Sequence, residues 1–326
     1  MKPARPWLLP LVPLYRLGQT IAELRSSPAR KLSWPVISVG NLSTGGAGKT
    51  PLAITLAKAL TARGLHVDVL SRGYGRRTKF AQRVDPNGTA EQFGDEPLLI
   101  ARDAGVPVYV AADRYEAGLM AESEQPESSK PVLHLLDDGF QHRRLARDID
   151  ILLLNRQDWT DTLLPAGNLR EPLKAARRAT VIAIPSDDPK LETELRRWGW
   201  QGSIWRLHRR MEVPRIDGPV AAFCGIARPD QFFAGLEAAG LQVASRTVFA
   251  DHHRYDSHDI HCLLGAAQTV GATALITTGK DRARIGNLAT TFPDFIPLLT
   301  ANLRIEIEDQ PNVIDWLIRK CNIPTP

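Results

Sequence analysis

The sequence predicts an α/β fold in which a mostly parallel sheet is flanked by helices and is followed by a second, smaller α/β domain. Two observations predict this fold. Short apolar runs alternate with helical patterns, and several runs are apolar throughout, which is typical of parallel strands buried on both faces. In addition, the apolar run 35–40 leads into a loop of small residues and then into a helix that opens near Pro51.

The expected strands of the first domain are 35–40, 66–70, 106–110, 132–136, 149–154 and 180–184. Residues 125–131 are polar, and we expect a surface loop there rather than a domain linker, because a strand of the same sheet follows at once. The pattern breaks near residues 205–215, and a new strand and helix begin at 220–224. We therefore expect an N-terminal segment over 1–30, a first domain over 31–212 and a smaller α/β domain over 213–326.

Composition excludes several classes of protein. With 326 residues, 43% hydrophobic and 24% charged, the chain is neither disordered nor a multi-span membrane protein. A net charge of +5 favours anionic partners such as phosphate or lipid, but it is too small for a dedicated nucleic-acid binder. Three cysteines give no disulfide framework, which suits the cytoplasm. We expect no nucleic-acid partner, and no obligate protein partner is evident.

The N-terminus combines apolar and basic residues. The apolar stretch 7–17 is shorter than the roughly 20 residues of a membrane span and contains Pro10 and Pro13. Glu23 is the only acid among the cations Lys2, Arg5, Arg16, Arg25, Arg30 and Lys31. This composition favours a segment at the surface of an anionic membrane. Two alternatives stay open: a helix packed on the core, and a signal peptide, although no small-residue cleavage pattern follows.

A phosphate-binding loop follows the first strand. It matches the pattern G-x-x-x-x-G-K-[ST], except for a serine at the first position, and comprises Ser43, Thr44, Gly45, Gly46, Ala47, Gly48, Lys49 and Thr50. Between a strand and a helix, such a loop cradles phosphate oxygens with its N–H groups. This context predicts a P-loop NTPase-like domain rather than a glycine turn that binds nothing. Lys49 is expected to neutralise phosphate charge, and Thr50 to offer its hydroxyl to Mg²⁺.

Three further motifs carry ionisable groups. Asp137 and Asp138 end a strand, where a carboxylate of a nucleotide site can hold the metal, although two acids there could merely cap a turn. Asp95 and Glu96 open a helix, so that one could bind Mg²⁺ while the other lies near an attacking hydroxyl. The run 251–253 places an aspartate before two histidines, which suits hydroxyl activation; a purely structural histidine and a zinc site are the alternatives.

These residues resemble the tetraacyldisaccharide 4'-kinases, also called lipid A 4'-kinases. The resemblance covers most of the chain, and the motif DDGFQH together with SRGYG is far more specific than the phosphate loop. The motifs that carry it occur in the family's order at residues 39–51, 71–75, 94–97, 137–142, 164–171, 249–253 and 278–281.

The resemblance implies transfer of the ATP γ-phosphoryl group to the 4'-hydroxyl of a tetraacylated glucosamine disaccharide 1-phosphate, in lipid A biosynthesis. It implies ATP and Mg²⁺ as cofactors, a lipid disaccharide and an anionic membrane surface as partners, and a peripheral position at the cytoplasmic face of a bacterial inner membrane. The basic, apolar N-terminus suits a lipid substrate. The motifs are contributed by both domains, so we expect the domains to close around ATP.

By the same resemblance, the catalytic residues are Asp95, His252, Lys49 and Asp251. Asp95 accepts the hydroxyl proton, coupled to a histidine of the second domain, for which His252 is preferred over His253. Thr50, Glu96 and Asp137 hold the metal. Arg72, Tyr74, His142 and Arg170 are the candidates for binding the lipid headgroup or the triphosphate, because arginine pairs well with phosphate oxygens.

Other functions remain as alternatives. A membrane-associated P-loop ATPase without a small-molecule acceptor often has a lysine where this loop has Thr44. A kinase of a soluble sugar or nucleoside would leave the apolar N-terminus without a role outside the core. A lipid-binding module without activity would leave the phosphate loop and the acidic pairs unused.

Overall fold

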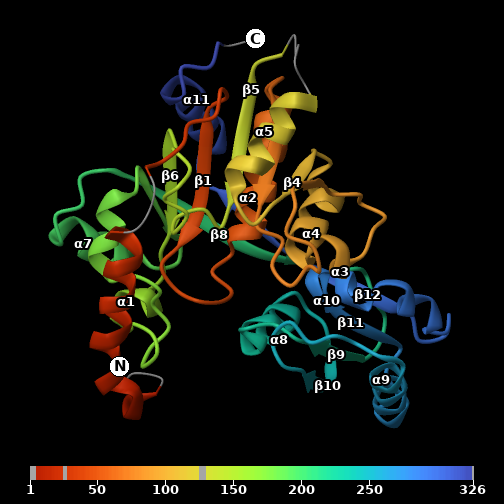
Figure 1. Cartoon of the computed structure of the whole chain (residues 1–326). Coiled ribbons are helices and arrows are strands. Elements are labelled where there is room, and N and C mark those ends of the chain that lie inside the picture. The colour runs from red at the N-terminus through yellow and green to blue at the C-terminus, as the bar shows by residue number, and fades with distance from the viewer. Residues whose placement is uncertain (1–4, 25–27, 125–129, 325–326) are drawn as a thin grey trace.

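The fold is built on one sheet of twelve strands with helices on both faces, in a computed structural model that describes residues 5–24, 28–124 and 130–324 (Figure 1). The strand order is β10-β9-β11-β12-β8-β7-β6-β1-β5-β2-β4-β3, and only the β3/β4 and β8/β12 pairs are antiparallel. The predicted α/β class with a mostly parallel sheet is therefore confirmed. Lys2, Arg25 and most of the loop expected at 125–131 lie outside the described residues.

The predicted strands are present, with ends that shift by one or two residues. The twelve strands are β1 Val36–Asn41, β2 His66–Ser71, β3 Gln82–Arg83, β4 Val108–Val110, β5 Val132–Asp137, β6 Ile149–Leu153, β7 Val181–Pro185, β8 Ser203–Glu212, β9 Val220–Cys224, β10 Val243–Val248, β11 Ala274–Thr278 and β12 Leu298–Ile307.

Helices complete the described chain. They are η1 Pro6–Leu11, α1 Val12–Leu24, α2 Lys49–Ala62, α3 Ala90–Phe93, α4 Asp95–Ala104, α5 Arg114–Glu124, α6 Arg156–Thr160, η2 Leu173–Arg178, α7 Pro189–Arg197, α8 Pro229–Ala238, α9 Ser257–Thr269, α10 Gly279–Ile285, η3 Gly286–Thr291 and α11 Gln310–Lys320. On one face of the sheet, α2, α4 and α11 share a core with β1, β2 and β5. On the other face, α5, α7 and η2 cover the same strands and their neighbours.

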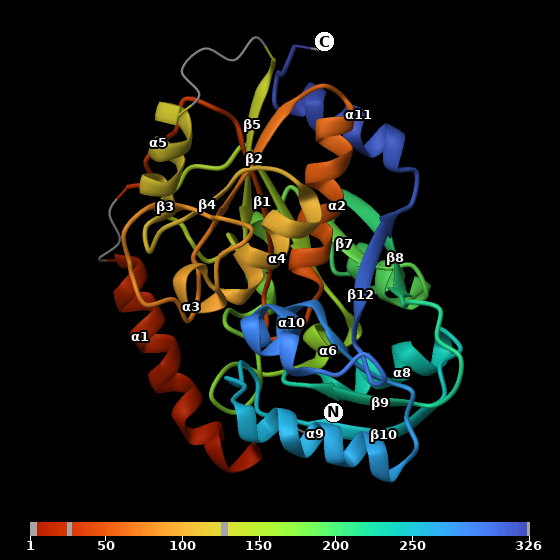
Figure 2. The same cartoon turned by 90° about the vertical axis from the view of Figure 1, so that its right-hand side faces the viewer.

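Two lobes are visible in Figures 1 and 2. We call residues 213–301 the small lobe, in which α8 and α9 cover opposite faces of β9 and β11. The rest of the described chain is the large lobe. The two lobes share a strand, because β12 pairs with β11 through residues 298–301 and with β8 through residues 302–307.

Residues 205–215, where we expected the strand pattern to break, are largely a strand. In β8, Trp205 and Leu207 are buried while Arg206 and His208 are exposed, an alternation typical of a strand covered on one face. After β12 leaves the small lobe, Thr55 of α2 donates a hydrogen bond to the carbonyl of Ile305 (2.7 Å). The division of the chain at 212/213 stays a prediction, while residues 302–324 pack on the large lobe.

The N-terminal helices lie along the outside of the large lobe (Figure 2). Trp7 is 75% exposed, Leu14 66% and Leu17 56%, and no residue of η1 is buried. Val12 and Tyr15 attach α1 to the core, and the Tyr15 hydroxyl donates to the carbonyl of Arg170 (3.1 Å). The helix α1 thus contacts the core through Val12 and Tyr15, while Leu14 and Leu17 stay exposed. Within the described ranges, no helix combines the length and the hydropathy of a membrane span.

Candidate active site

The phosphate loop connects β1 to α2 as predicted. Gly45 and Gly48 have φ angles of 85° and 92°, which favour glycine, and α2 begins at Lys49, directly after Gly48. Thr44 is anchored through its N–H to the carbonyl of Asn168 (2.8 Å). The N-terminus of α2 and the loop amides therefore form the anion-binding arrangement of a nucleotide site.

The small lobe covers this loop. A Cβ atom added to Gly45 would lie 2.8 Å from the Cβ of Ala227, and one added to Gly46 would lie 3.3 Å from the side chain of Arg228. From the large lobe, Arg209 donates to the carbonyl of Ala47 (2.7 Å). The loop is therefore enclosed by residues that follow β9 and by β8, none of which the sequence analysis identified.

Lys49 lies in a polar network beside the loop. Its Nζ donates to Asn41 Oδ1 (3.0 Å) and is 3.5 Å from Asp138 Oδ1. Arg170 forms a bidentate pair with the same Asp138 carboxylate (3.1 and 2.9 Å) and also donates to Asn41 (2.5 Å). Burial opposes ionisation of Asp138, but Lys49 and Arg170 outweigh it and hold its pKa below the usual range. Arg170, a predicted substrate residue, thus lies next to Lys49.

Asp137 is the buried carboxylate of the site. It ends β5, whose register places it opposite Val39 of β1, immediately before the phosphate loop. It is 1% exposed, and neither of its oxygens has a hydrogen-bond partner among the described residues. Burial raises its pKa, and the carboxylates of Glu96 and Asp138 raise it further. An unpaired carboxylate at this depth is what a bound cation would stabilise.

Thr50, Glu96 and Asp137 are oxygen donors, the kind of ligand that Mg²⁺ prefers. Thr50 is buried in the first turn of α2, and Glu96 is in the first turn of α4. No cluster of three His, Cys, Asp or Glu side chains suited to a metal occurs in the part of the chain that the structure describes. Two carboxylates and a hydroxyl suffice, because Mg²⁺ in kinases takes its remaining ligands from phosphate and water.

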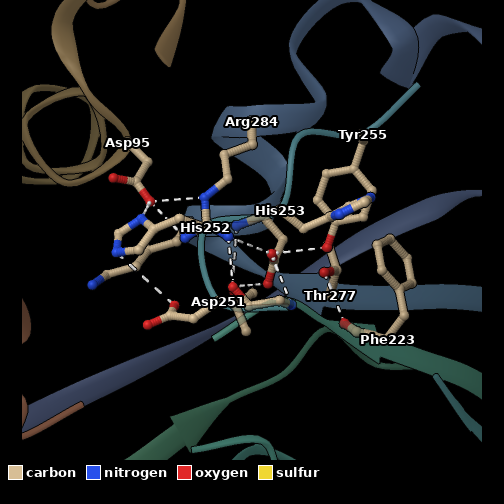
Figure 3. Close-up of polar contacts among 12 residues, drawn as sticks. Asp95, Phe223, Asp251, His252, His253, Tyr255, Thr277 and Arg284 are labelled. Carbon is tan, nitrogen blue, oxygen red and sulfur yellow. Dashed lines mark hydrogen bonds and ion pairs between the residues drawn. The ribbon is translucent and has the colours of Figure 1, made fainter. Parts of the chain in front are cut away.

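Asp95 and His252 meet where the two lobes touch (Figure 3). Asp95 Oδ2 lies 3.3 Å from His252 Nδ1 and accepts two hydrogen bonds from Arg284, at 2.8 and 2.5 Å. Burial opposes ionisation of Asp95, but His252 and Arg284 outweigh it and lower the pKa. The bond to Asp95 in turn raises the pKa of His252 against the effect of burial. The two side chains form a coupled pair.

The structure distinguishes the two neighbouring histidines. His252 has a φ of 60° and turns toward Asp95, while Asp251 Oδ1 lies 4.0 Å from its Nε2. His253 Nε2 instead lies 2.8 Å from Asp259, and its ring stacks on Phe249 with centroids 4.6 Å apart. His252 is therefore the histidine that faces the site, and His253 is part of the packing of the small lobe.

The remaining predicted substrate residues have different surroundings. Tyr74 is 61% exposed, and its ring centroid is 5.1 Å from that of His252. Arg72 is exposed. His142 is mostly buried near Asp113, and burial together with Arg114 lowers its pKa to about 4. His142 is therefore neutral at physiological pH and can accept or donate a hydrogen bond.

Sequence reasoning missed the two cations of α10 that enter the site. Lys280 pairs with Glu96, and Arg284 pairs with Asp95 and with Asp281, which is fully buried. Lys280 belongs to the motif 278–281, and Arg284 follows it at the helical spacing of four. That spacing was the one signal available, because the acids lie more than 180 residues earlier in the chain.

Comparison with known proteins gives the family. The family model described as tetraacyldisaccharide-1-P 4'-kinase matches residues 4–322. The tetraacyldisaccharide 4'-kinase of Koribacter versatilis is 41% identical over 300 residues, covering 89% of this chain and 90% of that protein. The enzyme of the same name from Geobacter metallireducens is 38% identical, covering 79% and 80%.

A solved structure agrees with these relatives. The crystal structure of the "apo" form of LpxK from Aquifex aeolicus in complex with ATP superimposes with a TM-score of 0.73 at 31% identity, covering 96% of this chain and 98% of that one. Family model, relatives and fold thus agree over nearly the whole chain. The chain belongs to the tetraacyldisaccharide-1-P 4'-kinase family.

Proposed function

We propose that this protein transfers the γ-phosphoryl group of ATP to the 4'-hydroxyl of a tetraacyldisaccharide 1-phosphate, with Mg²⁺, as a step of lipid A biosynthesis. The observation that carries the proposal is the Asp95–His252 pair, which joins the two lobes beside the phosphate loop. A pair that accepts a proton at that place can hold the hydroxyl of the acceptor opposite the terminal phosphate of the nucleotide.

ATP is bound by the loop 43–50. The backbone N–H groups and the N-terminus of α2 receive the phosphates, and Lys49 neutralises their charge. Arg170 and Asp138 position Lys49 through Asn41 and the contact of 3.5 Å. In phosphoryl transfer, catalysis is mainly positioning and charge neutralisation, so these contacts serve the reaction directly.

Thr50, Glu96 and Asp137 hold the metal ion. When bound, Mg²⁺ neutralises charge on the β- and γ-phosphate oxygens. The buried, unpaired carboxylate of Asp137 supports this assignment. Glu96 becomes available to the ion once its partner Lys280 moves away, and the phosphates offer Lys280 another anionic partner.

The Asp95–His252 pair accepts the proton of the attacking hydroxyl. Arg284 holds Asp95 ionised, and Asp95 orients the His252 ring through Nδ1. Asp251, 4.0 Å from Nε2, stabilises positive charge on the ring. The exposed phenol of Tyr74 packs near this imidazole and offers a surface for the sugar. Arg72, His142 and Arg170 are our candidates for binding the lipid headgroup or the triphosphate.

The exposed apolar side chains of η1 and α1 bind a membrane surface, with the enzyme peripheral at the cytoplasmic face of a bacterial inner membrane. Leu14, Leu17 and Ile21 form an apolar stripe at helical spacing, and each is more than 40% exposed. Arg16 on the same helix supplies attraction to anionic lipid.

Label transfer tests the proposal. Protein, Mg²⁺ and γ-labelled ATP are incubated with tetraacyldisaccharide 1-phosphate in mixed micelles, and in parallel without lipid. Label on the lipid supports the kinase; free phosphate released equally in both mixtures supports a membrane-associated ATPase, the alternative that the family does not favour. Lys49→Ala should lower transfer by at least about a hundredfold with an unchanged unfolding midpoint, and a wild-type rate would remove the loop from the mechanism.

A further inference from the structure

A short segment of the small lobe, residues 225–228, connects the Asp95–His252 pair to the phosphate loop. The segment follows β9 and leads into α8. At its first residue, the carbonyl of Gly225 accepts a hydrogen bond from the side chain of Arg284 (2.6 Å) and another from the backbone N–H of His252 (3.2 Å). Arg284 and His252 both contact Asp95 (Figure 3). The start of the segment is therefore fixed to the residues that we propose accept the proton.

The end of the segment lies on the phosphate loop. A Cβ atom added to Gly46 would lie 3.3 Å from both Cγ and Cδ of Arg228. Pro229, at the start of α8, disfavours the helical conformation for Arg228 and so helps to fix its backbone. In the proposed function, the γ-phosphate of ATP lies between the phosphate loop and the Asp95–His252 pair. The segment thus runs beside the group that is transferred.

The guanidinium group of Arg228 is a cation without a direct partner. Arg228 is half-buried, and its side chain forms no hydrogen bond or ion pair with the residues that the structure describes. Asp158 is 2% exposed and accepts hydrogen bonds from Ser43 and from the N–H of Asn155 (3.1 Å). Burial raises the pKa of Asp158, and the charge of Arg228 opposes this rise without forming a pair. Asp158 therefore leaves the donors of Arg228 available to a ligand.

A second arginine lies close to Arg228. Arg209 of the large lobe donates to the carbonyl of Ala47 (2.7 Å), the residue after Gly46. Burial, and after it the charge of Arg228, lowers the pKa of Arg209. Two cations from the two lobes thus lie close enough beside the phosphate loop to repel each other. An anion bound in the loop would relieve this repulsion.

We propose that Arg228 is a catalytic residue that binds the γ-phosphoryl group and stabilises its negative charge in the transition state. This inference rests on the proposed function. In the step, the acceptor oxygen bonds to the γ-phosphorus, the bond from that phosphorus to the bridging oxygen of ADP breaks, and the hydroxyl proton passes to the Asp95–His252 pair. The oxygens of the transferred group carry the charge, and a guanidinium group supplied by a second lobe suits them. The small lobe then supplies both a proton acceptor and a cation.

Substitutions of Arg228 separate its charge from its packing. Arg228→Met keeps an aliphatic stem over Gly46 and removes the guanidinium group, while Arg228→Lys keeps a positive charge. For Arg228→Met we expect kcat to fall by at least about a hundredfold, with the KM for ATP within about threefold of wild type. Arg228→Lys should lose less. Arg215→Met is the matched control, because Arg215 is an exposed arginine of the same lobe, and its kcat should stay near wild type.

Two kinetic outcomes would overturn the proposal. A kcat near wild type in Arg228→Met would show that the guanidinium group does not act in the reaction. A higher KM for ATP with an unchanged kcat would show that Arg228 binds the nucleotide equally well before and during transfer. The unfolding midpoints of the variants and of the wild type are compared first, so that a loss of kcat is not a loss of fold.

A measurement without acceptor keeps the two proposals separate. Fluoroaluminate bound beside ADP imitates the transferred phosphoryl group, so calorimetry of ADP and Mg²⁺ with and without it tests Arg228 independently of the lipid. We expect fluoroaluminate to tighten ADP binding by at least about tenfold in the wild type and in Arg215→Met, but not in Arg228→Met. An equal effect in all three proteins would overturn the role of Arg228. If the expected difference appears but no label reaches the lipid, only the proposed acceptor fails.

Discussion

Lys280 of the small lobe forms an ion pair with Glu96 of the large lobe, beside the unpaired carboxylate of Asp137. One turn later on α10, Arg284 pairs with Asp95, which precedes Glu96. The first two residues of α4 are thus each neutralised by a cation from the other lobe. The ammonium of Lys280 lies where the proposed function requires the positive charge of a metal ion.

Replacing Lys280 by methionine should therefore strengthen metal binding in the nucleotide-free protein. Lys280→Met removes a cation that competes for Glu96 while keeping the length of the side chain. We expect the affinity for Mn²⁺, measured by electron paramagnetic resonance, to rise by about tenfold. Lys320→Met, on the exposed end of α11, should leave it unchanged. An unchanged or weaker affinity in the first variant would contradict a competing role for Lys280.

Arg284 should be a major contributor to stability. Its side chain is 6% exposed and neutralises Asp95 and Asp281, which are 5% and 0% exposed. Arg284→Ala removes the guanidinium that pairs with both buried carboxylates, and we expect a loss of about 3–5 kcal/mol in the free energy of unfolding. Urea denaturation measures this loss. Arg282→Ala on the same helix is the control, and equal losses in both variants would show that the pairing contributes little.

Gly45 should tolerate no side chain. Its φ is 85°, and an added Cβ would lie 2.8 Å from the Cβ of Ala227. Gly45→Ala should weaken ATP binding, measured by calorimetry, because the loop must change shape or the small lobe must move away. Gly240→Ala is the control for backbone strain, since Gly240 has a φ of 90° and no atom within 4 Å of an added Cβ. Equal ATP affinity in the two variants would contradict the close approach of Ala227.

The buried imidazole of His134 should make stability depend on pH. Its Nδ1 lies 2.6 Å from Asp68, its Nε2 lies 3.5 Å from Glu122, and Trp34 stacks on its ring. Burial opposes protonation, but Asp68 and Glu122 outweigh it and raise the pKa of His134 to about 9. The protonated form is thus favoured in the folded state.

A raised pKa gives a stabilising contribution that is complete below the unfolded value near 6.5 and is lost as pH rises through 9. The expected loss is on the order of 3 kcal/mol, since one pKa unit corresponds to about 1.4 kcal/mol. Urea denaturation between pH 6 and 10 measures it. In His134→Gln the slope over this range should largely vanish, and a slope equal to that of the wild type would assign the effect to other groups.

The strands and the phosphate loop could be predicted from sequence because their signals are local. The run 132–136 consists largely of apolar residues, and Asp137 follows it directly. The predicted strand and the candidate metal ligand are therefore adjacent in the chain. The role of β8 could not be predicted in the same way. Its exposed Arg206 and His208 interrupt the apolar run, and its partner β12 lies about 100 residues later.

The ion pairs between the lobes could not be predicted from the sequence either. Lys280 and Arg284 show the spacing of one helical face, but nothing in the sequence links that face to Asp95 and Glu96. Tertiary structure also decides between His252 and His253, because a φ of 60° at His252 turns successive side chains toward different partners. Each motif can thus be recognised from neighbouring residues in the sequence, whereas the residues that it contacts depend on the tertiary structure.

The passage of β12 from the small lobe to the large one has a consequence for biosynthesis of the chain. Ile305, Ile314 and Leu317 belong to the core shared by β1, β2 and α2. On a ribosome, residues 31–212 emerge before β12, so the large lobe stays incomplete until residues 302–324 have also emerged. A product that stops at residue 301 would leave β8 as an open sheet edge, and we expect such a fragment to aggregate.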